Sequence, residues 1–305
     1  MKSSGIGGQA VIEGVMMRNQ EKYAVAVRKP NQEIEVKTDS HQSFIDKHKA
    51  LNIPFIRGIF NFVDSMKLGM QILSYSASFY EEEEEQEKDP KAEKRDGVIM
   101  GITMCVAVCL AVGIFVILPM SLSNLLRNWI DSKVLMGLIE GLIRLAIFIG
   151  YVLLISLMKD IRRVFMYHGA EPKCINCIEH GLDLTVENVR KSSKRHKRCG
   201  TSFLLFIVVV SIVFSMVIQT DVLWLRILLR ILLIPVVAGI SYEILRLAGR
   251  SDNWFVNLIS KPGLMLQGLT TREPDDDMIE VGIRSVEAVF DWKKYEEENF
   301  GKSYS

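Results

Sequence analysis

The sequence has almost no excess charge of either sign. Its 37 lysines and arginines stand against 36 aspartates and glutamates, which gives a formal net charge of +1 at pH 7. The overall balance therefore gives no reason to expect nucleic acid or an acidic protein as a partner. An ATP-binding loop, a dinucleotide-binding glycine fingerprint and a Ser-His-Asp order are missing too.

The N-terminus lacks the features of a cleaved signal peptide. MKSSGIGGQAVIEG has no long apolar core behind its basic start, and such a core marks a secretory signal. We therefore expect the chain to begin in the cytoplasm. The sequence also lacks an internal repeat of the kind that many transporters show.

Apolar residues are what the sequence has in abundance. They make up 49% of the chain, beside 24% charged residues, and this combination indicates membrane spans joined to sizeable aqueous parts. A bilayer core about 30 Å thick needs roughly 20 apolar residues in a helix. Four stretches qualify, so we expect a mainly α membrane protein with transmembrane helices at 98–120, 134–158, 201–218 and 222–245.

Loop charges predict the orientation of these spans. The 159–200 segment holds ten lysines and arginines, whereas the 121–133 loop holds two. Because basic loops stay on the cytoplasmic side, the long loop and both termini are expected in the cytoplasm. The expected location is the bacterial cytoplasmic membrane. Only Gln219, Thr220 and Asp221 separate the last two spans, which predicts a tight hairpin.

The pattern divides the chain into seven segments. These are a β-rich segment (1–40), an amphipathic helix (41–80), a charged linker (81–97), spans one and two (98–158), a cytoplasmic loop (159–200), spans three and four (201–249) and C-terminal cytoplasmic or interfacial helices (250–305).

The first segment predicts a small β-hairpin or sheet. Strands are expected at 9–18, 22–29 and 33–37, with Pro30-Asn31-Gln32 as a turn. The helix at 55–78 contains three charges, so an interfacial helix or one packed on the membrane domain fits better than a span. A crossing here would move the N-terminus to the other side.

The C-terminal segment predicts two further helices. Residues 253–269 are apolar and interrupted by Gly and Pro, which suits the membrane interface. Pro274 and three aspartates then mark a helix start. Apolar residues follow at helical spacing and predict an ordinary core stripe; they are Ile279, Ile283, Val286 and Phe290.

Three of the five cysteines have metal-ligand spacing. Cys174-x2-Cys177 is followed, after eighteen residues, by His196-x2-Cys199, the pattern of two short knuckles around a zinc. A reducing cytoplasm disfavours disulfides there. The alternative is that Cys174 and Cys177 are unliganded residues of a buried turn. His168 and Glu171 are alternative ligands, or one of them a general base.

Five motifs resemble the YqhQ-like family of bacterial membrane proteins, along essentially the whole chain. They are GGQAVIEGVMMR (7–18), YHGAE (167–171), LTVENVR (184–190), RCGTSF (198–203) and GLMLQGLTTREPDD (263–276). Members of that family are labelled as a domain of unknown function or as predicted metal-dependent enzymes. The resemblance therefore implies a metal site and leaves the reaction open.

One departure from the family pattern bears on the ligands. The family usually reads G-A-E-H-K where this chain has Gly169-Ala170-Glu171-Pro172-Lys173, and its members tend to lack a cysteine at 174. Our hypothesis is that Cys174 replaces the histidine lost at 172. Four protein ligands would close a structural zinc site. With one ligand fewer, hydrolytic chemistry becomes attractive, with Glu13 or Glu171 as general base.

Four charged residues fall in the expected outer half of the spans. Glu140 and Arg144 are four residues apart, as are Arg226 and Arg230, so each pair shares a helix face. One glutamate cannot neutralise three arginines. Asp131 or Asp221, near the outer ends of the spans, is one source of a further carboxylate, and a lipid phosphate is the sharper hypothesis. Snorkelling to the interface is the alternative. Gly137-x3-Gly141 permits close helix contact within the chain or in a homo-oligomer.

Three functions remain open from the sequence. The first is a membrane biogenesis or scaffold factor, in which zinc orders the cytoplasmic loop and interfacial helices receive membrane proteins or lipids. The second is a membrane-bound, metal-dependent, hydrolase-type enzyme acting on a lipid-linked or protein substrate. The third is a transporter, which only the charged spans favour.

Overall fold

The computed structural model describes residues 2–80, 90–197, 199–218, 220, 222–248 and 253–304. The chain forms two compact units. The sheet unit comprises Met1–Tyr80, Val152–Ile207 and Ala238–Ser305, and the span unit comprises Glu81–Tyr151 and Val208–Val237. Three long helices pass from one unit into the other: α5 (Lys133–Ile155), α8 (Gly200–Val217) and α9 (Leu223–Ala248).

A four-stranded antiparallel sheet forms the centre of the sheet unit. Its strands follow in the order β1 (Gly7–Val11), β2 (Gly14–Asn19), β3 (Lys22–Arg28) and β4 (Ile34–Ser40). The single strand expected at 9–18 is therefore wrong, because the chain reverses between Val11 and Gly14. Glu13 makes this turn with φ 49°, in the left-handed region. The expected turn at 30–32 is confirmed, since the Lys29 N–H donates to the Glu33 carbonyl across it.

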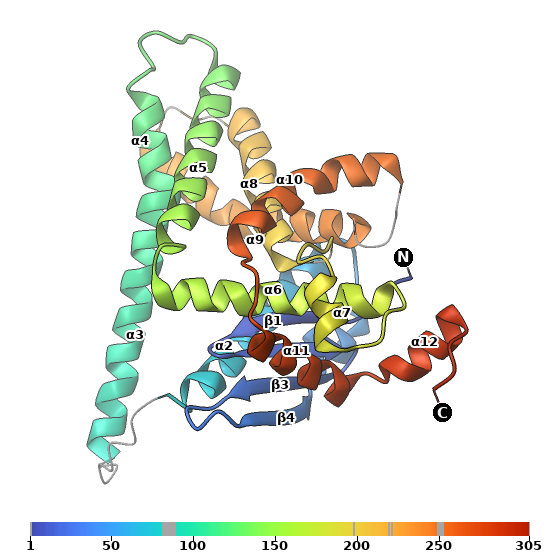
Figure 1. Cartoon of the computed structure of the whole chain (residues 1–305). Helices are drawn as coiled ribbons and strands as arrows, with labels where there is room; N and C mark the ends of the chain where they lie inside the picture. Colours follow the sequence, from blue (N-terminus) through green and yellow to red (C-terminus); the bar gives the residue numbers. More distant parts are fainter. Residues whose placement is uncertain are drawn as a thin grey trace. The chain divides into compact units, whose positions relative to one another are not determined.

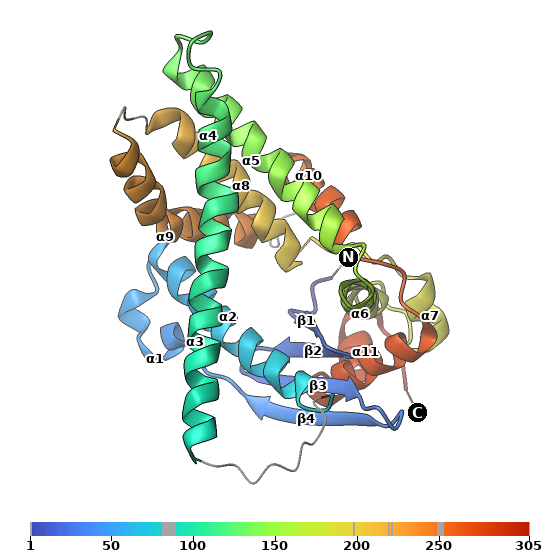
Figure 2. The same ribbon diagram turned by 90° about the vertical axis from the view of Figure 1, so that its left-hand side faces the viewer.

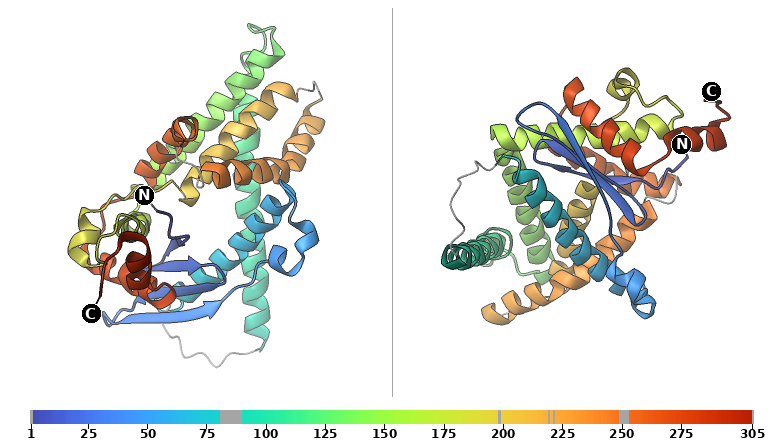
Figure 3. Two further views of the ribbon diagram at one scale, coloured as in Figure 1. Left: turned by 90° about the vertical axis from the view of Figure 1, so that its right-hand side faces the viewer. Right: turned by 90° about the horizontal axis from the view of Figure 1, so that it is seen from below.

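Both faces of the sheet are covered. Val15 and Met17 of β2 pack with α6 (Lys159–Glu179) and α11 (Asp276–Val289), whereas Met16 joins the core formed with α2 (Ile56–Ala77). This alternation follows from strand geometry, in which successive side chains point to opposite faces. Figures 1 and 3 show α11 and α2 on opposite faces of the strands.

The core stripe expected on α11 is confirmed. Ile279 and Val286 are fully buried, and Ile283 is 9% exposed. Phe290, the fourth residue of the stripe, lies just past the end of α11 and is partly buried against the same core. The segment 159–179, expected as part of a loop, is instead the continuous helix α6 with Pro172 inside it. The remaining elements of the sheet unit are α1 (Phe44–Lys47), η1 (Lys49–Leu51), α7 (Val186–Lys191), α10 (Trp254–Thr270) and α12 (Trp292–Phe300).

Four helices of the described chain are long and apolar enough to cross a membrane: Gly101–Asn124, Lys133–Ile155, Gly200–Val217 and Trp224–Ala248. With the small sheet, they confirm a mainly α membrane protein with four candidate spans. The first span contains a π-helical turn, η2 (Gly113–Ile117), between α3 (Pro90–Val112) and α4 (Leu118–Asn124). Figure 2 shows these three segments running on from one another.

Two expectations fall partly outside the described residues. Of the charged linker at 81–97, residues 81–89 are not described, and α3 already begins at Pro90. Proline at the first position of a helix is favourable because its missing N–H is not needed there. Gln219 and Asp221 of the tight turn also lie outside the described part of the chain.

Helix α2, expected at 55–78, is confirmed as a helix and is not among the four candidate spans. Its first turns pack against the end of α9. Arg57 donates to the Glu243 carboxylate at 2.6 and 2.5 Å, and Asn61 donates to the Tyr242 hydroxyl at 2.9 Å. A Cβ at Gly58 would lie 2.9 Å from the Gly239 carbonyl oxygen, so the two backbones nearly touch. Residue 58 must therefore be small.

Candidate metal centre

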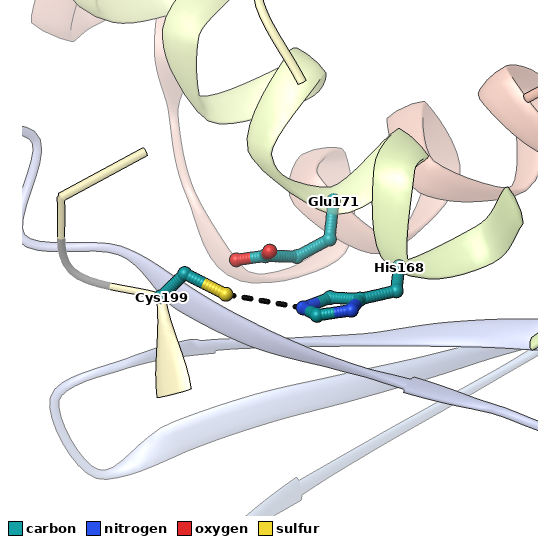
Figure 4. A group of neighbouring side chains, drawn as sticks. All are labelled: His168, Glu171 and Cys199. Atoms are coloured by element: carbon teal, nitrogen blue, oxygen red, sulfur yellow. Dashed lines mark hydrogen bonds between the residues drawn. The ribbon is translucent and has the colours of Figure 1, made fainter. Parts of the chain in front are cut away.

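His168, Glu171 and Cys199 gather in the sheet unit. One potential ligand atom from each lies within 4.8 Å of the other two. His168 and Glu171 come from α6, three residues apart and thus on adjoining parts of one helix surface. Cys199 comes directly before α8. Figure 4 shows the carboxylate and the imidazole directed toward the sulfur.

The hydrogen bonds of His168 fix which ring nitrogen carries the proton. Its Nδ1 lies 2.9 Å from the carbonyl oxygen of Thr270. Because a carbonyl can only accept, Nδ1 is the donor, and the neutral ring then presents the Nε2 lone pair. Nε2 lies 3.1 Å from the Cys199 sulfur. A histidine that donates one N–H to a backbone carbonyl and presents the other nitrogen has the arrangement of a metal ligand.

Cys199 and Glu171 are both buried, at 6% and 5% exposure. Burial raises the pKa of the Cys199 thiol, while its hydrogen bonds with Thr201 act in the opposite direction. A thiol with a raised pKa is a weak nucleophile by itself. The thiolate is also the form that binds a metal, so this shift does not distinguish a metal ligand from a nucleophile.

Two glycines allow the backbone to close around this group. A Cβ at Gly169 would lie 2.0 Å from the carbonyl oxygen of Arg272, so the segment after α10 runs directly across α6. The Arg272 N–H also donates to the Phe165 carbonyl, which fixes this crossing. A Cβ at Gly8 would lie 2.6 Å from Cγ of Glu171, because β1 lies against that side chain.

The donor set fits a zinc ion. Zinc commonly takes imidazole nitrogen, thiolate sulfur and carboxylate oxygen, at distances that place neighbouring ligand atoms about 3.4–3.6 Å apart in a tetrahedron. The observed nitrogen to sulfur distance is 3.1 Å, and all three atoms lie within 4.8 Å. Three protein ligands leave a fourth position open.

The structure does not bring the four ligands expected from the spacing together, because only Cys199 belongs to this group. Cys174 is fully buried, and its sulfur would lie 2.9 Å from a Cβ at Gly282 of α11. Burial raises its pKa well above the ordinary value. Cys174 thus packs in the core of the sheet unit, inside helix α6 and not in the buried turn that the sequence left open as the alternative. Its role as a zinc ligand stays a prediction.

Cys177 and His196 have other partners. The Cys177 thiol donates toward the carbonyls of Leu182 and Asp183, and burial raises its pKa to about 11. His196 Nε2 lies 3.2 Å from the Glu179 carboxylate. At about 100° per residue, Cys177 lies roughly 180° around α6 from His168. A helix that turns His168 toward Cys199 therefore turns Cys177 away.

Glu13, the other general base expected from the sequence, lies apart from the group. Its carboxylate pairs with Arg163 and accepts a hydrogen bond of 3.1 Å from the Tyr167 hydroxyl. It lines a separate pocket of about 690 Å³. The expected role of Glu171 as a base stays a prediction, since the same carboxylate is also placed to be a ligand.

Glu140, Arg144, Arg226 and Arg230, the charged residues singled out in the expected spans, all lie in the span unit. The structure brings Glu140, Arg144 and Arg230 together, and Arg226 lies one helical turn from Arg230. These residues form no part of the group of His168, Glu171 and Cys199.

All five sequence motifs meet around α6. YHGAE provides His168 and Glu171, RCGTSF provides Cys199, and the segment 263–276 provides the Thr270 carbonyl. GGQAVIEGVMMR provides Gly8, and LTVENVR provides the Arg190 carbonyl that accepts from Lys173. The sequence named His168 and Glu171 only as alternatives. The signal in the sequence is their separation by three residues within YHGAE, which places both side chains on one surface of a helix.

Comparison with known proteins gives a family without an assigned activity. Residues 53–292 match the model of a family described as "Protein of unknown function (DUF1385)". The chain is 36% identical over 306 residues to a protein of Bacillus subtilis (strain 168) described as "Uncharacterized protein YqhQ". That alignment covers 98% of this chain and 96% of the relative. No solved structure matches the chain.

Proposed function

This chain belongs to the DUF1385 family of proteins of unknown function, and we propose that it is a membrane-bound, metal-dependent enzyme of the hydrolase type. The proposal rests on one observation: His168, Glu171 and Cys199 converge with one potential ligand atom each. Catalytic zinc sites typically have three protein ligands and an open position, whereas structural sites have four. The grouping therefore favours catalysis over the closed, four-ligand alternative.

Each of the three side chains has a distinct role in this proposal. His168 presents the Nε2 lone pair because Thr270 holds its Nδ1 proton. Cys199 supplies the sulfur, and its proton is lost when a metal binds. Glu171 supplies a carboxylate oxygen held in place by the close approach of Gly8. A bound zinc would lower the pKa of a water in its open position and so supply a nucleophile.

The position of the centre in the chain favours a substrate at the membrane. Cys199 directly precedes α8, which is one of the candidate spans. Thr201, which bonds the Cys199 sulfur at 3.3 Å, is already part of that helix. The centre therefore lies at the end of a membrane-spanning segment. A lipid-linked substrate, or a protein segment close to the membrane, is the substrate class that can reach it.

Metal analysis of the purified full chain tests the proposal. Wild type should carry a single zinc per chain, and His168→Ala, Cys199→Ala and Glu171→Gln should each lose most of it. Cys105→Ser is the matched control, because this cysteine is an exposed residue of α3. Zinc should also raise the thermal stability of the wild type, since binding to the native state alone stabilises it. Equal zinc content in all five proteins would refute the centre.

A second measurement addresses catalysis. The zinc-loaded protein is incubated with vesicles of bacterial membrane lipid, and hydrolysis products are sought by mass spectrometry. Products that depend on zinc and disappear in Glu171→Gln are expected. Zinc binding without any turnover, on these lipids and on membrane-protein substrates, would favour the scaffold function instead.

The scaffold function is the second candidate, and one observation favours it. Helix α2 exposes a row of apolar side chains at helical spacing: Ile56, Val63, Met66, Met70 and Leu73. Such a row can receive a membrane protein or a lipid surface. The third function, transport, is favoured only by the buried charged residues of the spans.

A further inference from the structure

Four ionisable side chains are buried within the span unit. Glu140, Arg144, Arg226 and Arg230 are each 8% exposed or less, and they belong to the candidate spans of α5 and α9. Three of these groups are guanidinium ions and one is a carboxylate. Charges inside a membrane are costly unless they face a partner or a polar cavity. The excess of positive charge therefore needs a counter-charge.

The single carboxylate is shared between two helices. Oε1 of Glu140 lies 2.9 Å from Nη2 of Arg144 and 3.1 Å from Nη2 of Arg230. Glu140 and Arg144 belong to α5, whereas Arg230 belongs to α9. One carboxylate can neutralise only one of the two arginines. The shared carboxylate thus joins α5 to α9, and the three charged groups together keep a net charge of +1.

The remaining donors of Arg144 go to groups of the fold. Its Nε donates to the Phe115 carbonyl at 3.0 Å, and its Nη1 donates to the Ser211 hydroxyl at 3.0 Å. Phe115 lies in the π-helical turn η2, where the backbone hydrogen bonding of the helix is altered. Arg144 therefore has a positioning role within the helices.

Arg230 differs from Arg144. Its Nη1 donates to the Ser215 hydroxyl and its Nη2 to Glu140. Its Nε is buried and has no hydrogen-bond partner in the part of the chain that the structure describes. A buried donor without a partner costs free energy comparable to a lost hydrogen bond. Such a donor on a positively charged group indicates an acceptor, and a negatively charged one is favoured.

Arg226 lies one helical turn before Arg230, about 6 Å along α9. Its Nε and Nη2 both donate to the Thr220 carbonyl, at 2.9 and 2.6 Å. That carbonyl is neutral, so it orients the guanidinium without balancing its charge. The two arginines therefore form a ladder of positive charge on one face of α9.

A pocket of about 180 Å³ opens beside Arg226. Its polar lining includes Asn124, Arg127, Asp131, Ser132, Lys133 and Arg226. Three of these residues are basic and one is acidic, so the lining is positive overall. The volume is below the roughly 300–1,000 Å³ of pockets that hold drug-sized ligands. A single small headgroup or ion is the size class that it can accept.

We infer that the span unit binds a phosphate group in this pocket, carried by a lipid headgroup or free in solution. Arg226 lines the pocket and is the direct contact, whereas Arg230 lies one turn deeper on the same helix face and adds positive charge without lining the pocket. Guanidinium groups hold phosphate oxygens bidentately, which suits arginine at position 226. Arg226 lies two residues inside the span that begins at Trp224, about 3 Å along the helix. Lipid headgroups lie at this depth.

Native mass spectrometry of the full chain, freed of lipid in a neutral detergent, tests the inference. The probes are phosphatidylglycerol, diacylglycerol as a lipid without phosphate, and inorganic phosphate as a competitor. Wild type should retain phosphatidylglycerol and not diacylglycerol. Arg226→Gln should retain roughly tenfold less, since a charge-assisted contact is lost. Arg230→Gln should also retain less than wild type, because it removes a positive charge one turn from the pocket. Arg162→Gln, which removes an exposed arginine outside the spans, should behave as wild type.

Glu140→Gln supplies a test in the opposite direction. Removing the one negative charge should increase retention of phosphatidylglycerol, whereas a merely structural cluster would show no increase. Release of the lipid by inorganic phosphate would assign the site to the phosphate group itself, and resistance to it would assign the site to the whole lipid. Equal retention of both lipids by wild type, Arg226→Gln and Arg230→Gln would overturn the inference. Should Arg230→Gln fail to fold, Arg226→Gln decides alone.

Discussion

The Glu13 carboxylate accepts hydrogen bonds from both Nε and Nη2 of Arg163, 150 residues later in the chain. The pair joins the turn between β1 and β2 to helix α6. Tyr167, which is 1% exposed, donates its hydroxyl to the same carboxylate. Burial and this negative charge both raise the pKa of Tyr167. The left-handed turn at Glu13 is thus held in place by two side chains of α6, Arg163 and Tyr167.

A double-mutant cycle should detect the coupling between Glu13 and Arg163. Arg163 is half exposed, with 52% of its side chain accessible, so the coupling free energy should be about 1 kcal/mol and no more. The measurement is the free energy of unfolding of Glu13→Gln, Arg163→Ala and the double variant. Strictly additive effects would show that the contact contributes nothing.

Gly169→Ala should destabilise the protein by about 3 kcal/mol, because the new Cβ would lie 2.0 Å from the Arg272 carbonyl oxygen. It should also lower zinc content, since the same crossing places the Thr270 carbonyl beside His168. Gly150→Ala is the control, because a Cβ at that helical position meets nothing within 4 Å. Thermal unfolding in detergent compares the two. Equal melting temperatures would contradict the close approach.

The Cys177 thiol should make stability depend on pH in the alkaline range. Burial raises its pKa from 9.0 to about 11. Between these values the unfolded chain loses this proton and the folded chain keeps it, so stability falls as pH rises. The contribution is fully present below pH 9 and is lost as the pH approaches about 11. The thermal stability of wild type should therefore fall more steeply over this range than that of Cys177→Ala; parallel curves would contradict burial of the thiol.

The exposed row on α2 should contact lipid. Val63, Met66 and Met70 are 58, 55 and 49% exposed on one side of the helix, and the helix begins beside the end of the candidate span in α9. Met66→Trp, in a variant whose four native tryptophans are changed to phenylalanine, should be quenched by brominated lipid. Glu35→Trp, on strand β4, serves as the control. Equal quenching at both positions would count against an interfacial helix.

Features set by local composition could be predicted from the sequence. The four spans depend on the length of apolar runs, and the turn at 30–32 depends on proline and asparagine. The core stripe of α11 depends on a helical repeat. The resemblance to the YqhQ-like family, carried by five motifs, is confirmed by the 36% identity. None of these features depends on which distant residues the tertiary structure brings into contact.

The candidate site could be predicted only in part, because a spacing of three residues fits two different structures. Cys174 and Cys177 have the spacing of a metal knuckle, and they equally have the spacing of neighbours on a helix. Segment 159–179 is charged and contains Pro172, so its local sequence favoured a loop. Its apolar face packs on α11 and the sheet, and this tertiary contact makes it a helix. The directions of His168 and Glu171 then follow from α6, whereas Cys199 comes from the residue directly before α8.

X-ray absorption at the zinc edge of the purified, zinc-loaded protein tests the central claim most directly. A centre of His168, Glu171 and Cys199 predicts one sulfur at about 2.3 Å, with the other neighbours nitrogen or oxygen at about 2.0–2.2 Å. This spectrum should change in Cys199→Ser and remain the same in Cys174→Ser. Three sulfur neighbours, with loss of one in Cys174→Ser, would contradict the account and restore the four-ligand site of Cys174, Cys177, His196 and Cys199.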